Sequence, residues 1–272
     1  MSDPSRQLLV GAVAYHPRVV TVWEGFRDYF QRGGLGVDYL LYSNYERLVD
    51  ALVDGAVDLA WSTNTAYVAA EARLGGRARV LGMRDLDATW TTLVVARSGE
   101  VSDLGELAGK TLALGSRDSG HAAILPLHYV AEAGVPLDEL HLVRFDTDLG
   151  KHGDTGDSEL RVVRAVAGGQ AQAGAIGDPA WAQFRSSGVP ETEGLDVIWR
   201  SPEYSHCCFV ARPDLDPDVA GRWLELLLGM SYDDPDLRHY MDLEGVKRWL
   251  PGDKSGYATL TEAMREQGYL AG

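Results

Sequence analysis

Short apolar segments alternate with amphipathic segments along the first ninety residues of the chain. LLVGAVA at 8–14, DYLLYS at 38–43 and VDLAWS at 57–62 have the length and apolar content of buried strands. Between them apolar residues recur at helical spacing, and Gly33–Gly34 and Asp54–Gly55 fall where two of these helices should end. Strands and helices that alternate with short links indicate an α/β domain with a parallel sheet.

A second series of strands and helices begins after the β-rich segment TTLVVAR at 91–97. Three further strands are predicted at 110–114, 140–145 and 172–176, and a strand at 206–211 returns the chain to the first series. Helices are predicted at 119–133, 158–168, 217–229, 235–243 and 257–267. We therefore expect an α/β fold of two lobes, with the second lobe inserted into the first. The predicted first lobe comprises residues 1–93 and 206–272, and the second comprises residues 94–205.

Composition and charge narrow the classes of function. The net charge of −15 at pH 7 argues against nucleic acid as a partner, because phosphate backbones attract basic surfaces. Two cysteines in 272 residues are too few for a disulfide framework. No segment approaches the roughly 18 consecutive apolar residues of a membrane-spanning helix, so no membrane insertion is expected.

The first residues of the chain bear on its location. MSDPSRQLLVGAVAYHPRVV has no basic leader before an apolar run of signal-peptide length. The absence of a signal-peptide pattern favours a cytoplasmic location for the protein. The alternative is a periplasmic or extracellular protein from which a leader was removed.

Four segments resemble one family. DLGELAGKTLALG at 103–115 is similar to the entry into the second lobe of type 2 periplasmic binding proteins. The segments at 44–70, 159–181 and 211–228 resemble the phosphonate- and phosphate-binding-protein-like family of that fold. The resemblance implies a two-lobed α/β fold with a ligand cleft between the lobes. It also implies a small polar ligand (a carboxylate, a phosphonate or a zwitterion) and, if a leader was removed, an ABC permease as partner.

Ligands of open α/β sheets bind beyond the carboxyl ends of the strands, so we expect the loops after the strands to form the site. Two of these loops begin helices and are rich in hydroxyl groups, which together with free backbone N–H groups can bind an anion. The same residue types also serve as ordinary helix caps. The residues predicted to bind ligand are Tyr15, His16, Tyr45, Ser62, Thr63, Asn64, Thr65, Ser116, Ser119, Gly120, His121, Glu159, Asp178 and His206.

The chain departs from the resembled family at two places. The family's Ser-Thr-Ser-Gly at the start of the second-lobe helix reads Arg-Asp-Ser-Gly at 117–120, and its Ser-His pair reads Ser158–Glu159. An acid in place of an imidazole would repel a phosphonate and favour a ligand with a cationic group. Asp178 adds a second acid. These departures favour a carboxylate or phosphonate that also carries an amine over simple phosphate.

The two cysteines, Cys207 and Cys208, are adjacent and follow His206. Alternate residues of a strand face opposite sides, and the Cys-x-x-Cys spacing of a zinc site is absent. We interpret both cysteines as buried apolar residues of the return strand. His-Cys-Cys-Phe has a weak local similarity to the thiamine-pyrimidine synthases, which is too short to transfer a reaction.

The sequence therefore leaves two hypotheses of function open. The first is a binding protein for a small polar molecule, related to the substrate-binding proteins of ABC transporters. The alternative is a cytoplasmic enzyme on the same scaffold, a lyase or hydrolase for a small carboxylated substrate. Its acid–base or metal-binding groups would be His16, His121, His206 and Asp178. The sequence leaves both the cofactor and the oligomeric state open.

Overall fold

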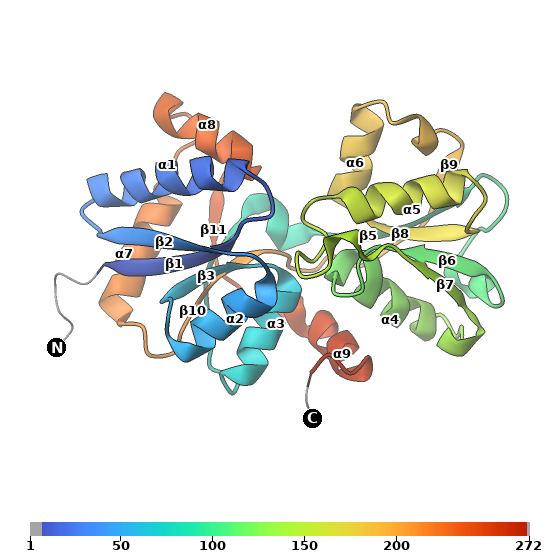
Figure 1. The fold of residues 1–272 in the computed structure, drawn as a ribbon, viewed down its shortest axis with the longest axis horizontal. Helices are drawn as coiled ribbons and strands as arrows, with labels where there is room; N and C mark the ends of the chain where they lie inside the picture. The colour runs from blue at the N-terminus through green and yellow to red at the C-terminus, as the bar shows by residue number, and fades with distance from the viewer. Residues whose placement is uncertain (1–6, 271–272) are drawn as a thin grey trace. The chain divides into compact units, whose positions relative to one another are not determined.

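Two separate β-sheets divide the chain into two units. The computed structural model describes residues 7–270. Unit 1 comprises the described residues up to Thr89 together with Ser205–Ala258. Unit 2 comprises Trp90–Tyr204 together with the described residues from Thr259 onward. The chain thus passes from unit 1 to unit 2 after Thr89, returns to unit 1 at Ser205 and passes to unit 2 again after Ala258 (Figure 1).

The sheet of unit 1 has six strands in the order β11-β4-β10-β3-β1-β2. Its strands are β1 (Leu8–Val13), β2 (Val37–Tyr42), β3 (Leu59–Ser62), β4 (Arg79–Arg84), β10 (Cys208–Ala211) and β11 (Trp249–Pro251). β1 runs parallel to β2 and β3, whereas β10 runs antiparallel to β3 and β4. The strands predicted at 8–14, 38–43, 57–62 and 206–211 are therefore confirmed.

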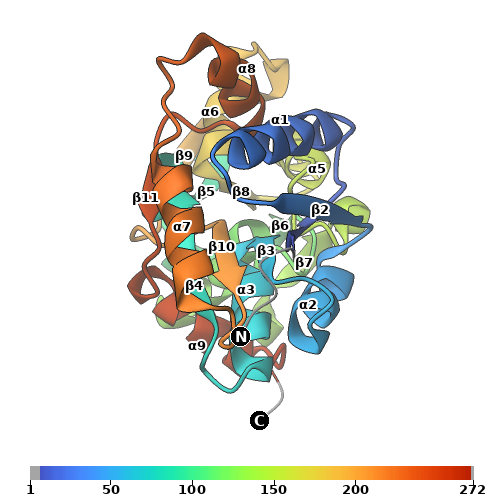
Figure 2. The same ribbon diagram turned by 90° about the vertical axis from the view of Figure 1, so that its left-hand side faces the viewer.

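Helices cover both faces of this sheet. They are α1 (Arg18–Arg32), α2 (Tyr45–Asp54), α3 (Asn64–Arg73), α7 (Pro217–Leu228) and α8 (Pro235–Glu244). α1 and α8 lie on the face opposite to α2 (Figures 1 and 2). α1, α7 and α8 share one apolar core with the strands, in which the rings of Phe30 and Trp223 stack with centroids 3.9 Å apart.

The sheet of unit 2 has five strands in the order β7-β6-β8-β5-β9. Its strands are β5 (Thr92–Arg97), β6 (Thr111–Leu114), β7 (His141–Arg144), β8 (Ala173–Gly177) and β9 (Leu195–Arg200). β6 is parallel to β7 and β8, and β5 is antiparallel to β8 and β9. The helices are α4 (Leu125–Glu132), α5 (Asp157–Ala167), α6 (Asp178–Ser186) and α9 (Ala258–Glu266), and a π-helical turn at Gly120–Ile124 precedes α4.

One glycine in each sheet allows a helix to approach a strand closely. A Cβ on Gly11 in β1 would lie 2.4 Å from Leu48 Cδ1 of α2. A Cβ on Gly174 in β8 would lie 2.5 Å from Val162 Cγ1 of α5. Both distances are too short for real carbon atoms, so a side chain at either position would force the neighbouring helix side chains to move.

The helix at the C-terminal end of the described chain was assigned to the wrong lobe. The sequence predicted the helix at 257–267 and placed it in the first lobe, but the described residues from Thr259 onward belong to unit 2. Glu266 lies 2.8 Å from the ring Nδ1 of His128, and Gln267 Nε2 donates to the carbonyl of Ile124 at 2.9 Å. Both partners lie in unit 2. The boundaries at 89/90 and 204/205 also precede the predicted ones, because Trp90 and Tyr204 pair with each other through their backbones.

None of the helices within residues 7–270 has the length and apolar character needed to cross a membrane.

Candidate functional site

The start of α3 in unit 1 gathers four of the predicted ligand-binding residues, Ser62–Thr65, and all four are buried. Thr63 caps the helix, because its hydroxyl accepts the backbone N–H of Ala66 at 3.3 Å. Asn64 Oδ1 accepts the N–H of Thr65 at 2.8 Å. The local sequence therefore explains the helix start itself, as the capping interpretation predicted.

Capping does not use every polar atom at the start of α3. Within the described residues, the hydroxyl of Ser62 and the amide Nδ2 of Asn64 are buried and have no hydrogen-bond partner. A buried donor left unpaired costs about 1–3 kcal/mol, so native proteins pair nearly all of them with protein, water or ligand. The partial positive charge of the helix N-terminus lies at the same place and favours an anion. This position has the properties of an anion-binding site.

Three other predicted residues of unit 1 lie in different surroundings. Tyr45 begins α2 with its side chain in the protein interior, 2% exposed. His16 is exposed, and its Nδ1 accepts the backbone N–H of Arg18 at 3.1 Å at the start of α1. Tyr15 is half-buried, with the Arg18 guanidinium 5.7 Å from its ring centroid. Their roles as ligand contacts stay predictions.

His206 belongs to a buried ion-pair network. Its Nδ1 lies 3.4 Å from Oδ1 of Asp87, which is fully buried. The guanidinium of Arg84 donates to both carboxylate oxygens of Asp87, at 2.5 and 2.9 Å. Burial alone would raise the pKa of Asp87, but Arg84 and His206 more than offset this and lower it. The sequence pattern does not reveal the roles of Arg84 and Asp87, because both lie in a segment with several charged residues, which is typical of a solvent-exposed surface.

The same network weighs against a metal ion. Asp87, His206 and Cys207 could each offer a ligand atom within 4.8 Å of the others. However, Arg84 already binds both oxygens of Asp87, and a second cation there would meet the guanidinium charge. Cys207 Sγ and Asp87 Oδ1 also approach the same ring nitrogen of His206, so the imidazole cannot relay a proton between them. In the described part of each unit, no such group of three includes His16 or His121.

The two cysteines are buried free thiols. Cys207 packs in the core formed with α1 and α7. Burial raises the pKa of Cys208 to about 12, although a hydrogen bond with Tyr257 lowers it in part, so this thiol stays protonated at neutral pH. Both cysteines are core residues, as expected, but only Cys208 belongs to the return strand β10, and Cys207 directly precedes it.

The start of the π turn and α4 in unit 2 gathers a second group of predicted residues. Ser119 caps the turn by accepting the N–H of Ala122 at 3.2 Å. The hydroxyl of Ser116 accepts the N–H of Asp148 at 3.0 Å and so fixes the loop that precedes α5. Both serines and Gly120 are buried. The hydroxyl groups of Ser116 and Ser119 have protein partners, in contrast to the hydroxyl of Ser62 at the start of α3.

His121 follows directly and pairs with Glu159 of α5, with Nε2 3.5 Å from Oε2. Both side chains are buried, and Glu159 Oε1 accepts the backbone N–H of Gly177 at 2.7 Å. Burial alone would lower the pKa of His121. The negative charge of Glu159 and its hydrogen bond, with smaller effects of Asp154 and Asp148, more than offset burial and raise the pKa.

Asp178 begins α6, directly after Gly177. Its Oδ2 accepts the hydroxyl of Thr91 at 3.1 Å and pairs with the guanidinium of Arg200. The same guanidinium nitrogen of Arg200 lies 2.9 Å from the hydroxyl oxygen of Thr91. The sequence analysis missed Arg200, which lies at the end of β9, a strand that it did not predict.

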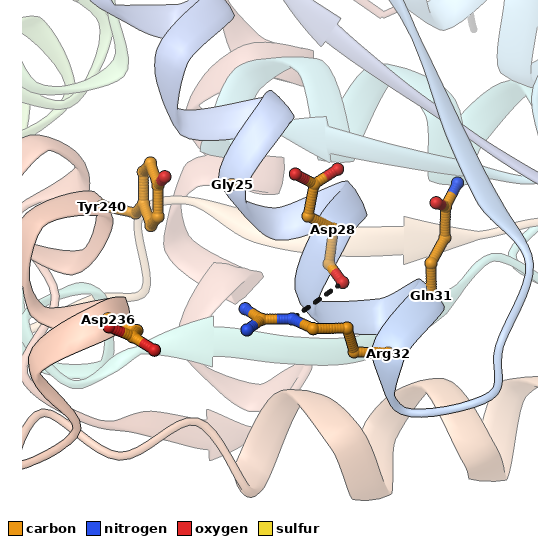
Figure 3. A pocket seen from close by; sticks show the side chains of 6 residues that line it. All are labelled: Gly25, Asp28, Gln31, Arg32, Asp236 and Tyr240. Carbon is orange, nitrogen blue, oxygen red and sulfur yellow. Dashed lines mark hydrogen bonds between the residues drawn. The ribbon is translucent and has the colours of Figure 1, made fainter.

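A groove lies between α1 and α8 in unit 1 (Figure 3). It is lined by Gly25, Asp28, Gln31, Arg32, Asp236 and Tyr240. A Cβ on Gly25 would lie 2.5 Å from the ring of Tyr240, so glycine is needed for the close packing of these two helices. None of the residues predicted to bind ligand lines this groove.

Two α/β units joined by three chain crossings, with polar helix starts at the ends of the strands, define the two-lobed fold of the periplasmic-binding-protein class. A model of one family of this class, described as the phosphonate periplasmic substrate-binding protein of ABC transporters, matches residues 11–257. The chain belongs to this family. The binding-protein hypothesis is therefore confirmed, and neither the alternative of a lyase or hydrolase nor the metal-binding variant of that alternative is supported.

Individual relatives agree with this assignment. A probable ABC transporter phosphite-binding protein, PhnD1 of Prochlorococcus marinus (strain MIT 9301), is 22% identical over 241 residues, which are 85% of this chain and 78% of the relative. The structure of PhnD1 with methylphosphonate has 20% identity and a TM-score of 0.75, and covers 98% of this chain and 99% of that one. The structure of XAC2383 of Xanthomonas citri, solved with ATP, has 19% identity and a TM-score of 0.78, and the match covers 98% of this chain and 100% of that one. These structures share the fold.

Proposed function

We propose that the protein is the substrate-binding component of an ABC importer and carries a small oxyanion, with a phosphonate or phosphite as the first candidates. The observation that carries the proposal is the pair of buried donors without a partner, Ser62 Oγ and Asn64 Nδ2, at the N-terminus of α3. An oxyanion would accept hydrogen bonds from both groups, and the partial positive charge of the helix N-terminus would stabilise its negative charge. PhnD1, of the same fold, was solved with methylphosphonate.

The family also supports a location and a partner. Its members are described as periplasmic, so we infer that this protein works outside the cytoplasmic membrane and delivers its ligand to an ABC permease. The periplasmic or extracellular alternative thus fits better than the cytoplasmic expectation, which is unconfirmed. Fractionation of the native host should recover the protein outside the cytoplasm, and its retention with cytoplasmic markers would contradict this location.

Asn64→Asp is the sharpest test of the binding site. Aspartate keeps the oxygen that accepts the N–H of Thr65 and is a good residue at a helix start, so folding should be preserved. It removes the Nδ2 donor and adds a negative charge beside the proposed anion. We expect the affinity for methylphosphonate or phosphite, measured by titration calorimetry, to fall by at least about 100-fold, since opposed like charges cost several kcal/mol.

The matched control is Asn44→Asp. Asn44 caps α2 in the same unit, and its Oδ1 accepts the N–H of Arg47 at 2.9 Å, so the chemical change is identical. We expect this variant to keep the unmodified affinity. Equal losses in both variants, or no loss in Asn64→Asp, would contradict the proposed site.

A further inference from the structure

Strand β10 begins beside the proposed oxyanion site, within unit 1. In the antiparallel register of β10 and β3, Cys208 lies directly opposite Ser62, and Phe209 lies opposite Trp61. The rings of Trp61 and Phe209 have centroids 4.7 Å apart and belong to the core formed with α1 and α7. Successive side chains of a strand point to opposite faces, so Ser62 and Cys208 together face the other side of the sheet.

Helix α3 packs against this part of the sheet. Tyr67 of α3 contacts Tyr257, with ring centroids 4.4 Å apart, and Tyr257 shares a hydrogen bond with the Cys208 thiol. The pKa of Tyr67 is raised mainly by burial, with contributions from Glu71 and Cys208. Cys208 therefore lies close both to Ser62 and to the helix whose N-terminus forms the proposed site.

The chemistry of sulfur explains why the Ser62 hydroxyl is unpaired. Ser62 is 1% exposed and Cys208 is fully buried, yet the hydroxyl of Ser62 has no hydrogen-bond partner within residues 7–270. Opposite residues of antiparallel strands have Cβ atoms about 4.5–5.5 Å apart, and serine and threonine hydroxyls form hydrogen bonds across such pairs. A thiol is a weak donor and a weak acceptor. A cysteine at position 208 thus leaves the Ser62 hydroxyl available, whereas a hydroxyl there would pair with it.

We propose that Cys208 is a positioning residue of the oxyanion site: it fills the space opposite Ser62 without engaging the serine hydroxyl, which is kept for the ligand. The inference rests on the proposed function, because it concerns the same donor, Ser62 Oγ. It also gives the two adjacent cysteines different roles, since Cys207 packs in the core on the opposite face of the sheet.

Cys208→Ser tests this role by replacing one sulfur atom with oxygen. The new hydroxyl pairs with Ser62, so a ligand must break this hydrogen bond in order to bind. We expect the affinity for methylphosphonate or phosphite, measured by titration calorimetry, to fall by about 3- to 10-fold, as for one ordinary hydrogen bond. Cys208→Ala brings no acceptor and should bind the same ligand at least about threefold more tightly than Cys208→Ser.

Cys207→Ser is the matched control. It makes the same change of one atom at the preceding residue, whose side chain packs in the core formed with α1 and α7. We expect this variant to keep the unmodified affinity, and chemical denaturation of both variants reports any loss of stability separately. Equal losses of affinity in Cys207→Ser and Cys208→Ser would show a general disturbance of this strand and would overturn the inference.

A double-mutant cycle distinguishes positioning from a structural effect. Ser62→Ala removes the donor, so it should weaken binding in the protein that retains Cys208. In Cys208→Ser the Ser62 hydroxyl is already engaged, so the same substitution should weaken binding much less. Losses that simply add would show that residue 208 does not act through Ser62.

The outcomes separate the inference from the function on which it rests. If neither methylphosphonate nor phosphite binds to the unmodified protein, the proposed function fails and this inference with it. If Asn64→Asp weakens binding but Cys208→Ser binds as tightly as the unmodified protein, the oxyanion site stands and Cys208 is excluded as its positioning residue.

Discussion

Asp87→Asn is expected to lower the free energy of unfolding by about 3–5 kcal/mol, the range for breaking a buried ion pair from one side. Asp87 is fully buried, and only 13% of the Arg84 side chain is exposed, so the variant leaves a guanidinium without its counter-charge. Asparagine keeps one oxygen that can accept the N–H of Cys207, which Asp87 Oδ1 accepts at 3.1 Å, so the variant tests mainly the loss of the charge. Chemical denaturation at pH 7 measures the difference.

The pH dependence of this effect has a defined sign. The folded-state pKa of Asp87 is lowered, so its contribution is present above the unfolded-state pKa of about 3.9 and disappears as the pH falls through the folded-state pKa. The gap between the unmodified protein and Asp87→Asn should therefore be full at pH 7 and shrink below about pH 4.

Asp214→Asn is the control for Asp87→Asn. Asp214 also accepts two hydrogen bonds from an arginine, Arg212, at 2.9 and 2.7 Å, but its side chain is 65% exposed. Exposed ion pairs contribute about 0–1 kcal/mol, so a small loss is expected here. A loss below about 1 kcal/mol in Asp87→Asn would show that the buried network is not a main source of stability.

Glu159→Gln is expected to destabilise the protein more at acidic pH than at alkaline pH. Glutamine keeps the acceptor for the N–H of Gly177 but removes the charge that faces His121. The folded-state pKa of His121 is raised, so the stability gained from its protonation is full below the unfolded-state pKa of about 6.5 and is lost as the pH rises through the folded-state pKa. We expect a loss of about 3 kcal/mol at pH 5.5 and about 1 kcal/mol at pH 9.

Denaturation of Glu159→Gln at both pH values measures this difference. Glu132→Gln is its control, because Glu132 lies 3.7 Å from His128 in the same unit but is 59% exposed. The control should change stability by less than about 1 kcal/mol at either pH. A loss in Glu159→Gln that is equal at pH 5.5 and pH 9 would contradict the assignment of a protonated, buried His121.

The sequence was sufficient to predict the two α/β series and the helix starts. The strands at 8–14 and 110–114 are recognisable because a buried strand needs a short apolar segment whatever surrounds it. The polar residues at Ser62–Thr65 are recognisable for a similar reason, since the first N–H groups of a helix need acceptors close in sequence. Features that arise from neighbouring residues are therefore predictable from local pattern.

The sequence did not predict which unit the last helix joins. The amphipathic pattern at 257–267 specifies one apolar face, but any apolar surface of complementary shape can cover such a face. The partners of this helix, His128 and Ile124, lie more than 100 residues away in the chain. Only the folded structure decides between two sheets that offer similar surfaces.

The charges of the candidate site show most clearly which features the sequence predicts and which only the tertiary structure decides. The sequence by itself determined the family, the order of the elements and the presence of two acids, Glu159 and Asp178, after predicted strands or at helix starts. The tertiary structure alone decided that His121 and Arg200 are paired with them. The physical reason is that the energy of a charge depends on its distance to other charges and on burial, and residues far apart in the chain set both.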